Sequence, residues 1–192
     1  MIRKARPEDL ENIFAIYQKV ALDRTKLKDL DYQTKIQKEG FLLGLDNQET
    51  YKGLIKEAHS LLVAKENEKI TGYIIADHRE KYYDDEYKTW FDPEAKNLYY
   101  NDPCSMSIAA IAVSPGYSQR GIATTLLKEL ENKLKSENFK YLYSIVTLAP
   151  VTNCPSIIFH GKNGFRRIAM GKPRTLFNLD GYSGILFYKA LQ

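Results

Sequence analysis

The sequence predicts a mixed α/β fold in which a central, mostly antiparallel sheet of about seven strands carries helices on both faces. Short apolar runs alternate with stretches of helical periodicity, and this order begins and ends with a strand. A hairpin pattern at residues 60–78 favours antiparallel neighbours. A strand, a helix and a second strand between residues 105 and 148 favour one parallel pair. A chain of 192 residues is long enough for one core, so we expect a single domain over residues 1–192.

The first third of the chain is predicted to supply one strand and the helices beside it. Residues 1–5 form a strand, and Pro7 opens a helix whose apolar residues recur at helical spacing, namely Leu10, Ile13, Phe14, Tyr17 and Ala21. Residues 22–37 are polar with widely spaced apolar residues, which indicates helix and loop. Residues 48–59 form a short helix, with inward positions at Tyr51, Leu54, Ile55 and Ala58.

The middle of the chain contains a hairpin and then an interruption. Residues 60–65 and 70–78 are apolar strands around a polar turn. Residues 80–103 break the pattern, because they are crowded with aromatic and acidic side chains and lie between two core strands. We interpret them as an insert that is too aromatic to be wholly disordered. A lid, a contact in a homodimer and a helix that only covers the sheet edge are the alternatives.

The remaining elements are predicted from apolar runs and from their flanking turn residues. In chain order they are a strand at 105–113, a helix from Gly121 with Ile122, Leu126, Leu127, Leu130 and Leu134 on one side, a strand at 141–148, a helix opened by Asn153, a strand at 167–170, a polar loop at 171–183 and a final strand at 184–190. These alternating elements place helices on both faces of the sheet.

The composition argues against several classes of function. The net charge of +4 is interspersed and not collected into a basic run, so no nucleic-acid partner is expected. No apolar run approaches the roughly 18 residues of a membrane span, and the segment MIRKARPEDL turns acidic too early for a signal peptide. Cys104 and Cys154 are too few for a disulfide framework or a Cys-rich zinc site. We therefore expect no metal, no membrane contact and a cytoplasmic location.

The most informative stretch is VSPGYSQRGIATTLL, residues 113–127, in which an apolar run meets a Pro-Gly turn, a short polar loop and an amphipathic helix. Backbone N–H groups at the start of a helix have no intrahelical acceptor, and the helix dipole adds partial positive charge there. A phosphate or pyrophosphate is therefore a natural ligand, with Gly121 permitting close approach and Arg120 adding charge. An ordinary strand-to-helix connection is the alternative interpretation.

Two motifs in this part of the chain resemble the GCN5-related N-acetyltransferase (GNAT) family. The family's coenzyme A loop has the form Arg/Gln-x-x-Gly-x-Gly/Ala, and residues 118–123 match it except that Ser118 holds the first position. The second motif is matched by Asn153, Ser156, Phe159, Gly164 and Phe165. Here His160 takes the place of the usual tyrosine. The two motifs cover about a third of the chain, and the order of elements agrees with this fold.

The resemblance implies acetyl-coenzyme A as cosubstrate and a cleft for it at the parallel strand pair. Backbone amides of residues 119–124 would hold the pyrophosphate, with the hydroxyls of Ser118 and Thr124 nearby. Main chain at residues 111–113 would pair with the pantetheine arm and polarise the acyl oxygen, although this run also fits a plain buried strand. The implied cofactor-binding residues are Ile111, Ala112, Val113, Ser118, Gln119, Arg120, Gly121, Ile122, Ala123, Thr124 and Asn153.

The resemblance also implies proton transfers at both ends of the reaction. His160 is the candidate acid for the leaving thiolate, because a histidine near pKa 6.5 can protonate a thiolate near 8.5. A half-buried histidine without chemistry is the alternative. Many family members carry a glutamate base at the position of Ser107, so the base is open and Asp102 is a candidate. Asn153 is a candidate ligand of the pantetheine or a plain helix cap.

A thiol nucleophile built from Cys154 and His160 is disfavoured. Six residues on a helix correspond to about 600°, which places the two side chains on different faces. Four aromatic residues near loops are candidates to line an acceptor pocket, namely Trp90, Phe91, Phe177 and Tyr182. This assignment depends only on their positions in or beside predicted loops.

The leading hypothesis is an acetyl-coenzyme A-dependent N-acetyltransferase in which a primary amine attacks directly in a ternary complex. The acidic and aromatic insert favours a small cationic acceptor, such as a polyamine, an aminoglycoside or a basic amino-acid derivative. A peptide N-terminus or a protein lysine is an alternative acceptor. A module that binds coenzyme A without turnover is a second alternative, because the usual tyrosine and glutamate are absent. A site for another nucleotide leaves residues 153–165 unexplained.

Overall fold

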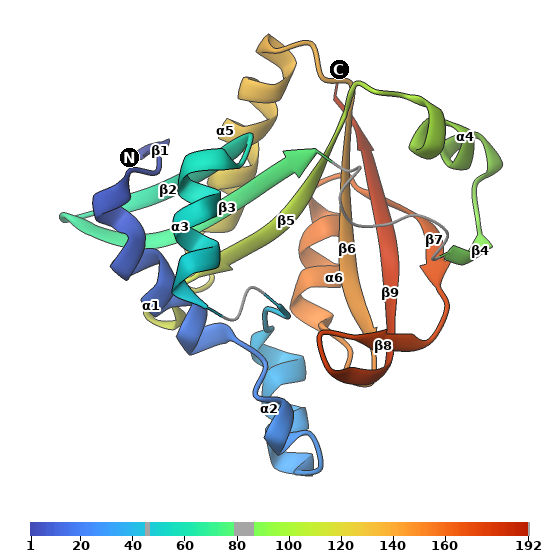
Figure 1. The fold of residues 1–192 in the computed structure, drawn as a ribbon, viewed down its shortest axis with the longest axis horizontal. Helices are drawn as coiled ribbons and strands as arrows, with labels where there is room; N and C mark the ends of the chain where they lie inside the picture. The colour runs from blue at the N-terminus through green and yellow to red at the C-terminus, as the bar shows by residue number, and fades with distance from the viewer. Residues whose placement is uncertain (45–46, 79–86, 192) are drawn as a thin grey trace.

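The computed structural model describes residues 1–44, 47–78 and 87–191. In these residues nine strands form one curved sheet in the order β1-β2-β3-β5-β6-β9-β7-β4, with β8 paired to β9 (Figure 1). Their bounds are β1 Ile2–Lys4, β2 Ser60–Glu66, β3 Lys69–His78, β4 Tyr87–Trp90, β5 Ser105–Val113, β6 Tyr141–Ala149, β7 Arg166–Gly171, β8 Arg174–Leu176 and β9 Leu179–Ala190. All described pairs are antiparallel except β5 with β6, so the predicted fold class is confirmed.

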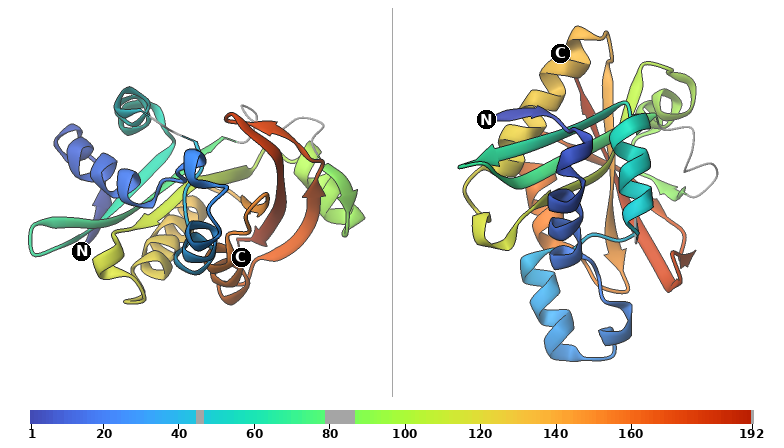
Figure 2. Two further views of the ribbon diagram at one scale, coloured as in Figure 1. Left: turned by 90° about the horizontal axis from the view of Figure 1, so that it is seen from below. Right: turned by 60° about the vertical axis from the view of Figure 1, so that its left-hand side comes forward.

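Helices cover both faces of this sheet, as Figure 2 shows. Helices α1 and α3 lie on one face and α5 and α6 on the other, while α4 lies near β4 and β7 and α2 packs against α6. The bounds are α1 Leu10–Val20, α2 Leu30–Glu39, α3 Gln48–Glu57, α4 Pro93–Asn101, α5 Ile122–Ser136 and α6 Cys154–Lys162, with short 3₁₀ turns at Pro7–Asp9, Arg24–Lys26 and Pro115–Tyr117. No described helix is both long and apolar enough to cross a membrane.

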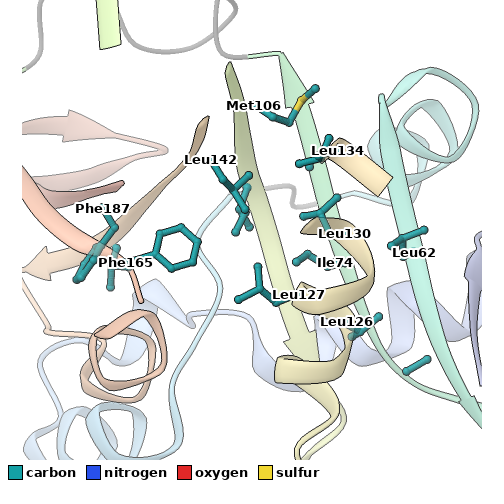
Figure 3. Packing of buried hydrophobic residues seen from close by; sticks show 14 of the residues in the cluster. Leu62, Ile74, Met106, Leu126, Leu127, Leu130, Leu134, Leu142, Phe165 and Phe187 are labelled. Atoms are coloured by element: carbon teal, nitrogen blue, oxygen red, sulfur yellow. The ribbon is translucent and has the colours of Figure 1, made fainter. Parts of the chain in front are cut away.

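The core divides along the two faces of the sheet. Alternate residues of β2 and β3 face opposite sides, because side chains alternate along a strand. Under α5 and α6, the buried cluster in Figure 3 includes Leu62, Ile74, Met106, Leu126, Leu127, Leu130, Leu134, Leu142, Phe165 and Phe187. Under α1 and α3, the second cluster includes Ile13, Ile16, Tyr17, Tyr51, Ile55, Leu61, Val63, Tyr73, Ile75, Ala110 and Ala112. The inward sides predicted for the helices at residues 10–20 and 122–134 are confirmed.

Strands β5 and β6 are paired over only part of their length. Parallel pairing runs from Ser105 opposite Tyr141 to Ile108 opposite Ser144 and then stops. Figure 1 shows the two strands close together near the C-terminus and separating as they descend. Both strands continue beyond this point, β5 along β3 and β6 along β9. The result is a wedge between residues 109–113 and 145–149, which we call the β5–β6 gap.

A β-bulge in β5 lies at the start of this gap. Ile75 pairs with Ala110 and the next residue of β3 pairs with Ile108, which leaves Ala109 as the extra residue. Ala109 is exposed although β5 lies in the middle of the sheet. Because of the extra residue, Met106 and Ile108 face α5, whereas Ala110 and Ala112 face α1 and α3.

Two predicted irregular segments contain more structure than expected. The prediction of a loop at residues 171–183 is wrong, because β8 and the start of β9 form a hairpin there. Phe177 and Asn178 have φ values of 49° and 58°, the left-handed pair that a tight hairpin turn requires. The predicted insert contributes β4, which extends the sheet edge beside β7, and α4. Residues 80–86 of that insert lie outside the described residues.

Candidate active site

The β5–β6 gap exposes backbone donors on β5. The amide of Ser114 donates to the Thr71 carbonyl at 2.8 Å, so Ser114 points its hydrogen-bonding groups toward β3. Those groups alternate in direction along an antiparallel strand, and Ala112 therefore points the same way. The Ala112 oxygen lies 2.8 Å from an ideal Cβ on Gly72, which agrees with that direction. The N–H groups of Ile111 and Val113 face the gap instead, where no described residue pairs with them.

A second set of free donors, the amides of residues 119–124, lies in the segment 118–124, which we call the phosphate loop. Gln119 and Gly121 have φ values of 64° and 78°, and these left-handed residues turn the chain into the first turn of α5. Gly121 is the N-cap of α5, and no side chain caps that end of the helix. In the described chain, backbone amides from Gln119 to Thr124 donate to no acceptor, whereas Thr125 bonds back to Gly121. Successive free amides of this kind form an anion-binding concavity.

The electrostatics of the phosphate loop also favour an anion. The first turn of α5 contains no acidic residue that would compete for the amides or oppose the helix dipole. Arg120 is exposed, and its guanidinium lies 5.0 Å from the centre of the Tyr117 ring. An ideal Cβ on Gly121 meets nothing within 4 Å, so the space above that residue is open. The loop is therefore accessible to a phosphate from solvent.

Asn153 holds two segments of the chain together. Its Oδ1 accepts from the Ser156 amide at 3.2 Å and caps α6, while its Nδ2 donates to the Phe41 carbonyl at 2.7 Å. Its backbone amide donates to the Thr147 carbonyl at the end of β6. Asn153 is 8% exposed. The side chain therefore fastens the segment after α2 to the end of the gap, and the predicted role as helix cap is confirmed.

His160 is buried on α6, with 1% of its surface exposed. Its Nδ1 lies 2.7 Å from the Ser156 carbonyl, and because a carbonyl only accepts, Nδ1 carries the proton. Nε2 has no partner among the described residues. The surrounding rings belong to Phe159, Phe165 and Phe187. Burial lowers the pKa of His160 to about 4, although the Ser156 carbonyl opposes this shift, so the imidazole is neutral near pH 7.

The structure does not bring Asp102 to the gap. This residue ends α4, and its Oδ1 accepts from the Cys104 amide at 2.7 Å. Ser105 and Ile111 are six positions apart along β5, a distance of about 20 Å at ~3.3 Å per residue. Asp102 thus lies at the opposite end of β5 from the free amides. Cys154 is exposed whereas His160 is buried, so the thiol and the imidazole do not form a pair.

The predicted aromatic residues have different surroundings. Tyr182 is buried on β9, and Phe177 is 46% exposed at the tip of the β8–β9 hairpin. Trp90 packs against Tyr99 of α4, and Phe91 is 56% exposed. The structure therefore places only Tyr182 and Phe177 on the hairpin beside the segment that precedes α2.

The β8–β9 hairpin covers one side of the sheet, and we call this side the acceptor side. The Phe177 carbonyl accepts a hydrogen bond from the Arg24 guanidinium. A buried cluster joins the α1–α3 connection, the β6–α6 loop and the hairpin, and its members are Leu22, Ile36, Phe41, Val151, Leu179 and Tyr182. Sequence reasoning missed this closure, because the apolar residues of the cluster are spread singly over polar segments.

Comparisons with known proteins agree with this geometry. The family model described as Acetyltransferase (GNAT) family matches residues 23–165. The fold and this match define a class of acyltransferases that use an acyl-coenzyme A donor. The chain belongs to the GNAT acetyltransferase family, whose acyl donor is acetyl-coenzyme A. The free amides and the acid-free helix start fit that donor.

Solved structures share the fold over nearly the whole chain. The ribosomal-protein-S18-alanine N-acetyltransferase of Escherichia coli aligns with a TM-score of 0.65 and 14% identity, covering 100% of this chain and 94% of that chain. The PaiA N-acetyltransferase of Thermoplasma acidophilum, solved in complex with coenzyme A, aligns with a TM-score of 0.62 and 18% identity, covering 99% and 98%. Ard1 of Thermoplasma volcanium aligns with a TM-score of 0.66 and 16% identity, covering 100% and 97%.

None of the curated proteins matches the sequence. At the identities of the aligned structures, the similarity establishes the shared fold and nothing about the acceptor.

Proposed function

We propose that the chain transfers the acetyl group of acetyl-coenzyme A to a primary amine of a small cationic molecule, by direct attack in a ternary complex. The observation that carries the proposal is the placement of free amides at both ends of one strand–helix connection, at Ile111 and Val113 and again in the phosphate loop. Acetyl-coenzyme A carries hydrogen-bond acceptors at two separated places, the acyl and pantetheine oxygens at one end and the pyrophosphate farther along. These places correspond to the two sets of free amides.

The chain's own groups then have separate tasks. The amides of the phosphate loop hold the pyrophosphate of coenzyme A, with Arg120 and the hydroxyls of Ser118 and Thr124 at the rim. The amides of Ile111 and Val113 bind the pantetheine arm and the acyl oxygen, and one oxyanion donor is worth about 3 kcal/mol. When bound, acetyl-coenzyme A supplies the thioester carbon that the amine attacks.

The leaving thiolate receives its proton from solvent in this proposal. The predicted acid, His160, is neutral near pH 7 and its proton is engaged with the Ser156 carbonyl. A thiol has a pKa near 8.5, so its thiolate is a moderate leaving group near neutral pH without a buried acid. His160 then stabilises α6 against the sheet, and turnover does not depend on it.

The acceptor side supports a small molecule over a folded protein. The hairpin contact between Phe177 and Arg24 and the buried cluster beneath it cover this side. An extended peptide or a protein loop needs an open groove, which this closure narrows. A small amine needs only a pocket of its own size. Peptide or protein acceptors remain the second candidate, since one of the aligned structures is named for ribosomal-protein alanine acetylation.

The cytoplasm is the proposed location. Cys104 and Cys154 are both free thiols, which suits a reducing compartment. A blocking assay of the two thiols in intact cells, with and without prior reduction, tests this assignment. Thiols that are already reduced in the cell agree with it, and thiols that need prior reduction contradict it.

The test of function is a free-thiol release assay with acetyl-coenzyme A against polyamines, aminoglycosides, amino acids and short peptides. The variant Ile111→Pro removes one free amide from the gap, and Ile111→Val keeps it. We expect acceptor-dependent release by the wild type and by Ile111→Val, with a loss of roughly 100-fold in Ile111→Pro. Thermal unfolding shows whether Ile111→Pro remains folded.

Other outcomes select the alternatives. Coenzyme A binding without release on any amine favours a binding module, and stabilisation of the fold by the ligand alone measures that binding. Release only with peptides moves the acceptor to the protein class. Equal turnover by Ile111→Pro and wild type removes the assigned role of the Ile111 amide.

A further inference from the structure

Three residues form one row across the sheet at the closed end of the β5–β6 gap. Ser107 of β5 lies opposite Asp77 of β3 on one side and opposite Tyr143 of β6 on the other. The row is one pair before the last parallel pair, Ile108 with Ser144. Residues directly opposite each other share a face, and their Cβ atoms lie about 5 Å apart. The row therefore sits beside the point at which the strands part.

This row faces away from α5. Met106, the neighbour of Ser107, is buried under α5, so Ser107 projects from the other face. Tyr143 on the same face is covered by Tyr99 of α4, with ring centroids 5.0 Å apart. Asp77 is partly exposed. The carboxylate thus lies on the face of the sheet opposite α5, beside the closed end of the β5–β6 gap.

Asp77 is partly exposed, Ser107 is 9% exposed, and their polar groups have few partners among the described residues. Asp77 Oδ1 accepts from the adjacent His78 amide at 2.8 Å, and no other described group bonds to its carboxylate. The Ser107 hydroxyl makes no hydrogen bond with any described residue. The Ser107 hydroxyl oxygen is also not one of the fully buried polar atoms that lack a hydrogen-bond partner. A carboxylate and a small hydroxyl side by side form a proton acceptor with a short relay.

We propose that Asp77 is the general base of the reaction, taking a proton from the acceptor ammonium through the Ser107 hydroxyl and intervening water, because Ser107 lies four strand positions, about 13 Å, from Ile111. The assignment rests on the proposed transferase function. The ammonium gives one proton to the carboxylate, and its freed lone pair forms the new C–N bond. The C–S bond breaks and its electron pair leaves on sulfur. The second proton of the nitrogen neutralises the thiolate through solvent, and Asp77 returns its proton to solvent.

The sharpest test moves the carboxylate across the strand register. Asp77→Asn removes the base, and the double variant Asp77→Asn/Ser107→Glu restores a carboxylate on the same face about 5 Å away. We expect Asp77→Asn to lower kcat at least 100-fold with little change in the KM for acetyl-coenzyme A. The kcat of the double variant should be at least tenfold higher than that of Asp77→Asn. Glu57→Gln, an exposed carboxylate at the end of α3, is the matched control and should leave kcat within twofold.

Binding measurements separate this role from a structural one. Calorimetric titration with coenzyme A and thermal unfolding should give equal values for wild type and Asp77→Asn. Turnover by Asp77→Asn within twofold of wild type overturns the assignment while leaving the proposed function intact. Loss of turnover together with lost coenzyme A affinity, and no recovery in the double variant, also overturns it. No transfer by wild type to any amine overturns the proposed function and the base assignment together.

Discussion

The hydroxyl of Tyr182 lies 2.8 Å from the position that a Cβ on Gly184 would occupy. The Cγ2 of Ile145 lies 2.7 Å from the same position. Ile145 is the first residue of β6 beyond the last parallel pair. The absence of a side chain at Gly184 therefore lets the Tyr182 hydroxyl reach the edge of the β5–β6 gap on β6.

Gly184→Ala should disturb this packing. A methyl group there overlaps both neighbours, and overpacking of this kind costs about 1–3 kcal/mol in unfolding free energy. Urea unfolding measures the loss. Gly53→Ala is the control, because an ideal Cβ on Gly53 meets nothing within 4 Å and alanine is favoured in the α3 helix by up to about 1 kcal/mol. Equal stability of Gly184→Ala and wild type would contradict the packing described here.

Gly121→Ala should weaken coenzyme A binding. The residue has φ 78°, which costs an alanine about 1 kcal/mol, and the added methyl points into the open space above the phosphate loop. We expect a loss of affinity of roughly tenfold, equivalent to about 1.4 kcal/mol, by calorimetry. Gly116→Ala lies in the preceding 3₁₀ turn, also has open space around its Cβ, and should bind normally. Equal affinities of the two variants would remove the loop from the binding site.

His160 should make the fold sensitive to acid. The pKa of His160 is about 4 in the folded chain, below the ordinary 6.5 of the unfolded chain. Below pH 6.5, His160 is therefore protonated in the unfolded chain while it stays neutral in the folded chain. This contribution to stability is complete above pH 6.5 and is lost as the pH falls toward 4. Between pH 7.5 and pH 5.0 the loss is about 2 kcal/mol.

The variant His160→Phe isolates that contribution. It cannot take up the proton, so its unfolding free energy should fall by about 2 kcal/mol less than the wild type over the same interval. Chemical denaturation at both pH values measures the difference. The same variant should keep turnover within a few-fold of wild type. An unchanged pH dependence of stability, or a large loss of turnover, would show that the buried neutral imidazole is wrongly described.

Asn153→Ala should loosen the acceptor side. The change removes the cap of α6 and leaves the Phe41 carbonyl without its donor, so we expect a loss of about 2 kcal/mol. Asn163→Ala at the other end of α6 removes one hydrogen bond to the Phe159 carbonyl. Its loss of unfolding free energy should be about half as large. Thermal and urea unfolding compare the two. Exchange of the Leu42 amide, which donates to the Val20 carbonyl, should rise in Asn153→Ala and stay unchanged in Asn163→Ala.

Local patterns were sufficient to predict most of the fold. The leucines of α5 recur at helical spacing, and Pro and Asn at the start of α6 are ordinary helix signals. The β8–β9 hairpin escaped prediction, because polar side chains dominate it and its turn depends on left-handed backbone at Phe177 and Asn178. The bulge at Ala109 escaped too, since alanine fits either face and hides the change of register.

The candidate site was less predictable than the fold, because it depends on strand register and burial. Asp77 and Ser107 are thirty positions apart in the sequence, and only strand pairing shows that they are neighbours. Burial lowers the pKa of His160, and the rings that surround it include Phe187 of β9, which lies far from α6 in the sequence. The phosphate loop was predictable, because the turn, the glycine and the helix that create it are consecutive.

The extra residue at Ala109 determines which way the side chains and amides of the later residues of β5 point. Deleting one residue there forces a choice: either Met106 and Ile108 leave the α5 core, or Ile111 and Val113 turn their amides toward β3 and away from the gap. Either choice is far worse than losing one alanine side chain. A deletion at this point thus reverses the direction of the side chains and amides along part of β5. Substitution of the same alanine alters only one exposed methyl group.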